Sequence, residues 1–229
     1  MTGSLVSAAT RARVRDLATP VALALGRLGL SPNALTVIGF VGTCAAAFFA
    51  SNQAWLLSGI LVLVFGIFDL FDGALARATG KTSRLGAFLD STFDRAGETV
   101  TYFGIAIGCV YTPFRVGALL AAAALGVSQL VPYVRAKAES LGFAPGSGLM
   151  NVGVAPREIR LAILTATLIG TDLAGGLNMR FDTGLGEWPL FGTNDGSFIL
   201  AGGLGLITIL ATITVIQRVL HVRAQSREG

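Results

Sequence analysis

The sequence predicts an all-α integral membrane protein with six transmembrane helices and an N-terminal amphipathic interfacial helix. Two properties of the composition predict this class. Of the 229 residues, 53% are hydrophobic and only 13% are charged, whereas a soluble domain carries about 25% charged residues. The apolar residues form long runs that raise the mean hydropathy to +0.71, as membrane-spanning segments do. We expect one membrane domain and no second large soluble one.

Residues 1–30 form the first expected element, an N-terminal interfacial amphipathic segment. Between about Val6 and Leu28, four arginines lie among valine, leucine and alanine residues, which is typical of a helix on the membrane surface. Three of these arginines, together with Asp16, interrupt the continuous apolar core that a cleavable signal peptide needs. The four arginines are Arg11, Arg13, Arg15 and Arg27.

Six apolar stretches follow this segment, and each is near the ~20 residues that a helix needs to cross the hydrocarbon core. The first begins after the helix-breaking pair Ser31-Pro32. Together they define a six-helix membrane domain over residues 31–222, followed by a cytoplasmic tail over residues 223–229. In chain order they run from about Asn33 to Ser51, Trp55 to Arg77, Arg84 to Val110, Pro113 to Glu139, Pro156 to Gly176 and Phe198 to Leu220.

Positive charges gather on one side of these predicted spans. With the N-terminus inside, the inner segments hold most of the arginines and lysines, while the outer loops hold only Arg115 and Arg180. Cytoplasmic loops carry such an excess, so we expect a multi-pass protein of the cytoplasmic membrane with both termini in the cytoplasm. These loops and acidic lipid head groups account for the net charge of +4, and we expect no binding to nucleic acid.

Four aspartates stand near the cytoplasmic ends of the second and third predicted spans. Asp69 and Asp72 are spaced i, i+3, and Asp90 and Asp94 are spaced i, i+4, so each pair lies on one face of its helix. The short loop at Gly80-Lys81 makes the two helices antiparallel neighbours, so the pairs can face each other at similar depth. Four carboxylates at membrane depth indicate a functional site with cations between them. Oxygen ligands of this kind suit Mg²⁺ or Mn²⁺, and four of them suit two ions.

Small residues beside the acids would let a ligand or a helix approach closely. Gly73 follows the first pair directly, Ala76 comes one turn later, and Gly86 precedes the second pair by one turn. Arg77 could neutralise a phosphate at the cytoplasmic surface. The alternative, in which the acids only pair with basic neighbours, explains less because two facing pairs exceed what packing requires. Those neighbours are Arg77, Arg84 and Arg95.

The segment from Asp69 to Asp94 resembles, at every fixed position, the signature of the class I CDP-alcohol phosphotransferase family. It reads Asp69-x2-Asp72-Gly73-x2-Ala76-Arg77-x8-Gly86-x3-Asp90-x3-Asp94. The resemblance implies six transmembrane helices and a homodimer. It also implies the transfer of a phosphatidyl-type group from a CDP-linked lipid to an alcohol, with release of CMP.

The same resemblance implies a role for each matching residue. Asp69, Asp72 and Asp90 would be metal ligands. Asp94 would contact the second metal ion and act as the catalytic base that deprotonates the acceptor hydroxyl. The binding site for the CDP-lipid would be built from residues of the first three spans and their loop, namely Pro32, Asn33, Gly73, Ala76, Arg77, Ser83 and Gly86.

Basic residues at the cytoplasmic ends of the last three spans resemble those of the actinobacterial phosphatidylinositol phosphate synthases, which bind the phosphate of inositol 1-phosphate. By position these would be Arg135, Arg157 and Arg218, with Lys137 and Arg160 as neighbours. Arginine binds phosphate in a planar, bidentate manner. The resemblance suggests a lysine in place of Arg135, which keeps the charge but changes the geometry. Alternatively, these arginines serve only topology and lipid head groups.

We therefore expect a phospholipid synthase of the cell membrane that uses CDP-diacylglycerol, inositol 1-phosphate and two Mg²⁺ or Mn²⁺ ions. Its product would be phosphatidylinositol phosphate, and its partners would be the lipid bilayer and a second copy of the chain. The closest alternative is a phosphatidylglycerophosphate synthase that uses glycerol 3-phosphate, because a basic pocket separates inositol from glycerol only weakly. Serine has no phosphate for the arginines and is less favoured.

Two alternatives come from other classes. A metal-ion or proton-coupled transporter would more often place its acids near the membrane midplane and show internal repeats. An intramembrane prenyltransferase also uses aspartate-rich metal sites on a pyrophosphate, but the fixed glycine, alanine and arginine positions between the acids favour the CDP-alcohol family.

Overall fold

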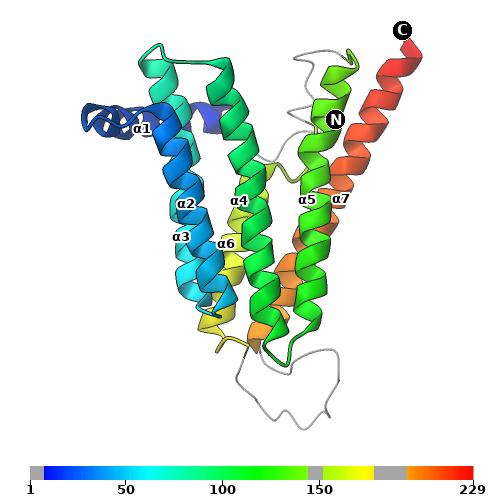
Figure 1. The fold of residues 1–229 in the computed structure, drawn as a ribbon. Helices are drawn as coiled ribbons and strands as arrows, with labels where there is room; N and C mark the ends of the chain where they lie inside the picture. The colour runs from blue at the N-terminus through cyan, green and yellow to red at the C-terminus, as the bar shows by residue number, and fades with distance from the viewer. Residues whose placement is uncertain (1–7, 144–151, 178–194, 229) are drawn as a thin grey trace.

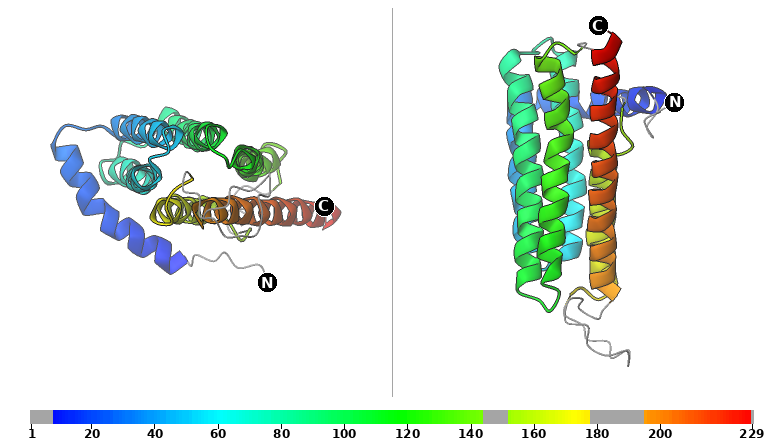
Figure 2. Two further views of the ribbon diagram at one scale, coloured as in Figure 1. Left: turned by 90° about the horizontal axis from the view of Figure 1, so that it is seen from below. Right: turned by 90° about the vertical axis from the view of Figure 1, so that its right-hand side faces the viewer.

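The computed structural model describes residues 8–143, 152–177 and 195–228, and the described residues form seven α-helices and no strand (Figure 1). This confirms the all-α class. Six helices run side by side, and the first lies across one end of them, next to the loop that joins α3 to α4 (Figures 1 and 2). The helices are α1 (Ala8–Arg27), α2 (Pro32–Ser51), α3 (Trp55–Ala78), α4 (Arg84–Val110), α5 (Val116–Ser140), α6 (Arg157–Leu173) and α7 (Asp195–Glu228).

The six parallel and antiparallel helices form a closed ring in which each packs against two others. The order around the ring is α2, α3, α6, α7, α5 and α4, and α4 closes the ring on α2. The left view of Figure 2 looks along the ring axis. In this order α4 and α6 lie opposite each other. The relation between α4 and α6 matters for the site, because side chains from both reach the centre of the ring.

Short, capped connections set the helix directions near the site. Ser31 caps α2 by accepting a hydrogen bond from the Ala34 amide at 3.1 Å. Gly80, with φ of 66°, ends α3, and the Lys81 amide donates to the Ala76 carbonyl at 2.9 Å, which is a glycine C-cap. The chain therefore reverses within a few residues, and the last turns of α3 and the first turns of α4 lie at the same end of the ring.

The prediction that α3 and α4 pack directly against each other was wrong in one respect. They are antiparallel and joined by a short loop, but α2 lies between them and packs extensively against both. Glycines explain this arrangement. A Cβ atom at Gly104 would meet the backbone of Ala47, and one at Gly97 would lie 3.3 Å from the Thr43 methyl. The absence of side chains at these positions lets α4 approach α2 closely.

The core of the ring lies mainly away from the site. A large buried cluster that includes Trp55, Tyr102 and Phe114 fills the half of the bundle around the α4–α5 connection. A second, smaller cluster joins α1 to α3, where Ala22 packs near Leu75. The second cluster holds α1 against the end of the ring that contains the acidic residues.

Four helices, α2, α3, α5 and α7, are long and apolar enough to cross a membrane. They confirm the coarser prediction, that the chain is a multi-pass membrane protein. The other two predicted spans do not have both the length and the apolar composition of a membrane-spanning helix. The helix α6 has only 17 residues, and α4 carries Asp90, Asp94, Arg95 and Glu98 in its first half. Six spans therefore remain a prediction.

Two helix ends differ from the sequence prediction. The fifth predicted span ends at Leu173 rather than near Gly176. The last helix continues to Glu228 rather than ending at Leu220, because residues 221–228 contain no glycine or proline that would stop it. The outer-loop Arg180 and the beginning of the N-terminal segment, including Val6, lie outside the described residues.

Candidate active site

Three carboxylates from α3 and α4 meet at the end of the ring that α1 crosses. Asp69, Asp72 and Asp90 each bring one oxygen atom within 4.8 Å of the others. Asp72 is buried, with 5% of its surface exposed, and the other two are partly buried. Buried carboxylates this close together repel one another unless a cation lies among them. The donor set, all oxygen and all acidic, fits Mg²⁺ or Mn²⁺.

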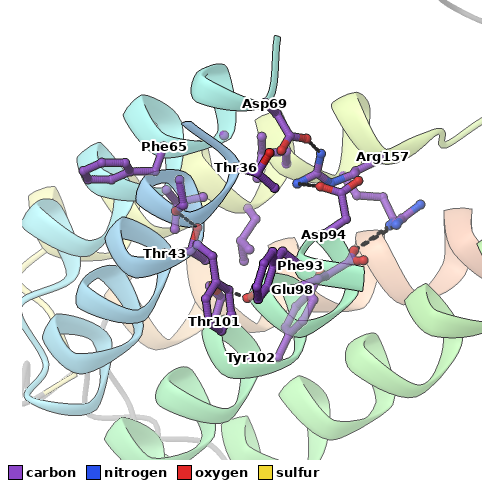
Figure 3. A pocket seen from close by; sticks show the side chains of 18 residues that line it. Thr36, Thr43, Phe65, Asp69, Phe93, Asp94, Glu98, Thr101, Tyr102 and Arg157 are labelled. Carbon is purple, nitrogen blue, oxygen red and sulfur yellow. Dashed lines mark hydrogen bonds and ion pairs between the residues drawn. The ribbon is translucent and has the colours of Figure 1, made fainter. Parts of the chain in front are cut away.

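The fourth predicted acid, Asp94, is not a member of this group of three but lines the same cavity as Asp69 and Asp90. Arg157, the first residue of α6, reaches across the ring and pairs with two acids (Figure 3). Its Nη2 atom lies 2.9 Å from Oδ1 of Asp94, and its Nη1 atom forms an ion pair with Asp69. A guanidinium group therefore lies between Asp69 and Asp94. The four predicted acids therefore lie near one another, and the chain itself supplies a positive charge between two of them.

Thr36 of α2 was not singled out from the sequence. Its Oγ1 atom donates a hydrogen bond of 2.6 Å to Oδ2 of the buried Asp72. The same hydroxyl lies 3.2 Å from the Pro32 carbonyl oxygen. Thr36 stands one helical turn after Pro32 and Asn33, which were both predicted to line the nucleotide site. This spacing was the one signal in the sequence that could have identified Thr36.

A cavity of about 200 Å³ opens beside Asp72 and Asp90, between α2, α3 and the start of α4. All seven residues predicted to bind the CDP-lipid line it. Lys81, which was not predicted, adds a second cation to that of Arg77. The full lining is Pro32, Asn33, Thr36, Asp72, Gly73, Ala76, Arg77, Lys81, Thr82, Ser83, Gly86, Ala87 and Asp90.

Two glycines keep the walls of this cavity open. A Cβ atom at Gly73 would lie 3.1 Å from Nη1 of Arg77. A Cβ atom at Gly86 would lie 3.3 Å from Oδ1 of Asn33 and 3.1 Å from Oγ of Ser83. Ser83 also has a structural task, because its Oγ accepts a hydrogen bond of 2.9 Å from the Gly86 amide and caps α4.

A larger cavity of about 400 Å³ lies on the other side of the acids, between α4, α5, α6 and α7. Asp90 lines both cavities and so stands between them. Five arginines face the larger cavity, which makes it the most basic part of the site. Its lining is Asp69, Asp90, Asp94, Arg95, Val131, Pro132, Arg135, Pro156, Arg157, Glu158, Arg160 and Arg218.

The basic residues predicted for the acceptor occupy different environments. Arg218 is buried, and its guanidinium donates to the carbonyl oxygens of Val152 at 3.1 Å and Val131 at 2.5 Å. These two contacts fix its orientation at the cavity wall. Arg135 is half-buried and pairs with the exposed Glu139 at 2.8 Å. Lys137 does not line the cavity; two residues after Arg135, it is turned roughly 200° around the helix and is exposed.

Arg160 is fully buried and is already engaged by the chain. It donates to Oε1 of Glu98 through Nε at 3.2 Å and Nη2 at 2.8 Å, and to the Ala155 carbonyl through Nη1 at 3.1 Å. Arg95 donates to the other oxygen of Glu98 at 2.7 Å. Glu98 was not singled out from the sequence, although it is a further acid within a predicted span, four residues after Asp94.

Comparisons with known proteins agree with this geometry. The profile of the CDP-alcohol phosphatidyltransferase family matches residues 29–172. The chain is 40% identical over 154 residues to the archaetidylinositol phosphate synthase of Pyrococcus horikoshii, covering 67% of this chain and 77% of that protein. It is 34% identical over 215 residues to the phosphatidylinositol phosphate synthase of Cutibacterium acnes, covering 93% and 95%.

Solved structures show the same similarity in three dimensions. The crystal structure of Mycobacterium tuberculosis phosphatidylinositol phosphate synthase with CDP-DAG bound superposes with a TM-score of 0.72 at 28% identity, over 90% of this chain and 94% of that one. The structure of the same synthase with manganese and citrate gives a TM-score of 0.72 at 28% identity, over 90% and 88%.

Proposed function

The chain belongs to the CDP-alcohol phosphatidyltransferase family, and from that premise we propose that it transfers a phosphatidyl group from CDP-diacylglycerol to inositol 1-phosphate. The products are phosphatidylinositol phosphate and CMP. One observation carries the proposal. The cluster of Asp69, Asp72 and Asp90 stands between a cavity lined by the family signature and a second cavity lined by five arginines. A donor and a phosphorylated acceptor could thus approach the acids from opposite sides.

The three clustered acids are the proposed ligands for Mg²⁺ or Mn²⁺. Their number, their oxygen atoms and their mutual distance of 4.8 Å or less support this assignment, as does the relative solved with manganese. Bound divalent ions would offset the charge of the donor pyrophosphate and of the leaving CMP. Thr36 donates a hydrogen bond to one oxygen of Asp72, which fixes the orientation of that carboxylate.

The smaller cavity is the proposed site for the cytidine diphosphate part of the donor. Gly73 and Gly86 let the ligand reach the backbone, and Arg77 and Lys81 supply positive charge for its phosphates. The amide of Asn33 offers both a donor and an acceptor to the base. A relative solved with CDP-DAG bound supports a CDP-lipid as the donor.

The larger cavity is the proposed site for the acceptor, whose phosphate would bind Arg135, Arg157 and Arg218. Asp94 lies on the same wall and can accept the proton of the acceptor hydroxyl. The acceptor oxygen then bonds to the lipid-linked phosphorus, the bond from that phosphorus to CMP breaks, and the proton goes to the Asp94 carboxylate. The relatives named as inositol phosphate lipid synthases favour inositol 1-phosphate over glycerol 3-phosphate.

We further propose that all six helices of the ring cross the cytoplasmic membrane and that α1 lies on its inner surface. Both termini would be cytoplasmic, which follows the distribution of arginine and lysine along the chain. In support, α4 and α6 run alongside the four apolar helices, and α1 lies across the end that holds the acids (Figure 1). The family resemblance adds a homodimer, which chemical crosslinking in membranes would test.

The experiment that tests the reaction is a CMP-release assay on purified protein with CDP-diacylglycerol and Mg²⁺ or Mn²⁺. Inositol 1-phosphate, glycerol 3-phosphate and serine are offered separately. We expect release with inositol 1-phosphate. CMP release only with glycerol 3-phosphate would show that inositol 1-phosphate is not the acceptor. No CMP release with any of the three would overturn the proposed reaction.

A further inference from the structure

Two ion pairs connect the opposite helices α4 and α6 across the ring. Arg157 meets Asp94 at 2.9 Å, and Arg160 meets Glu98 at 2.8 Å. The two acids are four residues apart on α4, and the two arginines are three residues apart on α6. Each helix therefore presents one charged face to the other. The first pair belongs to the site described above, whereas no function has yet been given to the second.

Both carboxylate oxygens of Glu98 accept hydrogen bonds from arginine side chains. Its side chain is 11% exposed and that of Arg160 is 2% exposed. One carboxylate oxygen accepts both hydrogen bonds from Arg160, and the other accepts the hydrogen bond from Arg95. Charge-assisted hydrogen bonds in a buried setting are strong and directional. One carboxylate thus fixes two guanidinium groups.

The Glu98–Arg160 pair marks the inner limit of the acceptor cavity. Arg160 lines that cavity and also a smaller internal one of about 50 Å³, and Glu98 lines only the smaller of the two (Figure 3). Glu98 is also one turn further along α4 than Asp94, away from the end that α1 crosses. Arg160 therefore presents positive charge at the inner side of the cavity, beyond the base, while Arg95 stands beside the base, with its Nη2 3.6 Å from Oδ2 of Asp94.

A phosphate dianion in this cavity is attracted by all five arginines. Without the charge of Glu98, Arg95 and Arg160 would draw the phosphate toward themselves and away from Arg218. The carboxylate of Glu98 offsets one of these two positive charges and accepts from Nη1 of Arg95 and from Nε and Nη2 of Arg160. Arg218, in contrast, is held by uncharged carbonyl groups and keeps its full positive charge.

We propose that Glu98 is a positioning residue for the acceptor: by offsetting part of the charge of Arg95 and Arg160, it directs the acceptor phosphate toward Arg218, which pairs with no acid among the described residues. The inference rests on the proposed function, because it assumes an acceptor that carries a phosphate. Glu98 itself touches no reacting atom and acts through the two arginines.

The test compares the full-length protein with its Glu98→Gln variant, which keeps the shape and one acceptor oxygen but removes the charge. Inhibition of CMP release by inorganic phosphate reports how strongly the cavity binds phosphate. We expect this inhibition constant to fall about tenfold and kcat to fall about tenfold, because phosphate is captured in the wrong place. The KM for CDP-diacylglycerol should stay within about twofold, because Glu98 does not line the nucleotide cavity. Asp172→Asn, near the far end of α6, is the matched control for loss of a carboxylate.

A second variant covers the case in which Glu98→Gln does not fold. Arg95→Gln leaves the Glu98 charge compensated by Arg160 alone and also removes the cation 3.6 Å from Asp94, so the inhibition constant for phosphate should rise about tenfold. In a folded Glu98→Gln protein, adding Arg95→Gln should return the constant toward that of the unmodified chain. A purely structural role would lower kcat and thermal stability without tightening phosphate binding.

Two results separate the inference from the proposed function. If the unmodified protein turns over inositol 1-phosphate but neither variant shifts the phosphate inhibition constant, the role of Glu98 is overturned and the reaction stands. If the unmodified protein releases no CMP with any phosphorylated acceptor, the reaction is overturned and the role of Glu98 falls with it.

Discussion

The hydroxyl of Thr36 donates a hydrogen bond of 2.6 Å to the buried carboxylate of Asp72. The two residues are 36 positions apart, on different helices, and the contact holds one proposed metal ligand in a single orientation. Partners of this kind fix the direction of a ligand atom and maintain its negative charge. Thr36 is therefore as much a part of the proposed metal site as the acids that the sequence displays.

Thr36→Val keeps the size and branching of the side chain and removes this hydrogen bond. We expect the affinity for Mn²⁺ to fall by about 10- to 100-fold, as is typical when a partner of a metal ligand is lost. A direct titration of Mn²⁺ binding to the purified protein measures this. Thr43→Val is the matched control on the same helix, because the Thr43 hydroxyl donates only to the Gly39 carbonyl. Equal Mn²⁺ affinity in the Thr36 variant and the unmodified protein would contradict the role.

Asp94→Asn separates donor binding from turnover. Asp94 lines the acceptor cavity but not the nucleotide cavity, so the variant should still bind CDP-diacylglycerol. Loss of a general base typically costs about 10²- to 10⁴-fold in rate, and we expect CMP release to fall within that range. Donor affinity, measured by equilibrium binding of a labelled CDP-lipid, should change little. A variant with normal turnover would remove Asp94 from its proposed role as base.

Much of this architecture could be predicted from the sequence because it depends on local patterns. Apolar runs and the breakers Ser31-Pro32 and Gly80 set the helices, and the i, i+3 and i, i+4 spacings of the acids set their faces. The helices and these faces require no knowledge of how distant helices pack. The nucleotide residues were predicted from the family resemblance instead; they come from the start of α2, the end of α3 and the start of α4 with its preceding loop, and they line one cavity.

The contacts of Thr36 and Glu98, which the sequence did not predict, depend on how distant helices pack. Small residues at Gly97 and Gly104 let α4 pack closely on α2, and the packing of α2 against α3 places Thr36 beside Asp72. Whether an arginine faces substrate or is held by the chain depends on its partner across the ring. Arg160 meets Glu98 from 62 positions away, and no spacing along the chain distinguishes it from Arg157.

Gly86→Ala tests the nucleotide cavity. The added methyl group would lie 3.3 Å from Asn33 and 3.1 Å from Ser83, so it narrows the cavity where the donor is expected. We expect the KM for CDP-diacylglycerol to rise about tenfold, since poor fit costs a few kcal/mol at most. The KM for inositol 1-phosphate should change little. Gly126→Ala is the control, because nothing lies within 4 Å of its added Cβ. A larger effect on acceptor KM than on donor KM would argue against the assignment of this cavity.

Arg135 and Lys137 test the acceptor cavity, because they are near in sequence but differ in position. Arg135 lines the cavity, whereas Lys137 is exposed on another side of α5. A hydrogen bond to a charged group contributes about 1.5–3 kcal/mol, so Arg135→Ala should raise the KM for inositol 1-phosphate at least about tenfold. Lys137→Ala should leave it within about twofold. Arg135→Lys should retain part of the affinity, since it keeps the charge and loses the planar, bidentate geometry. Steady-state CMP release at varied acceptor concentration measures all three. If Lys137→Ala raises the KM for inositol 1-phosphate as much as Arg135→Ala does, the acceptor phosphate binds outside this cavity.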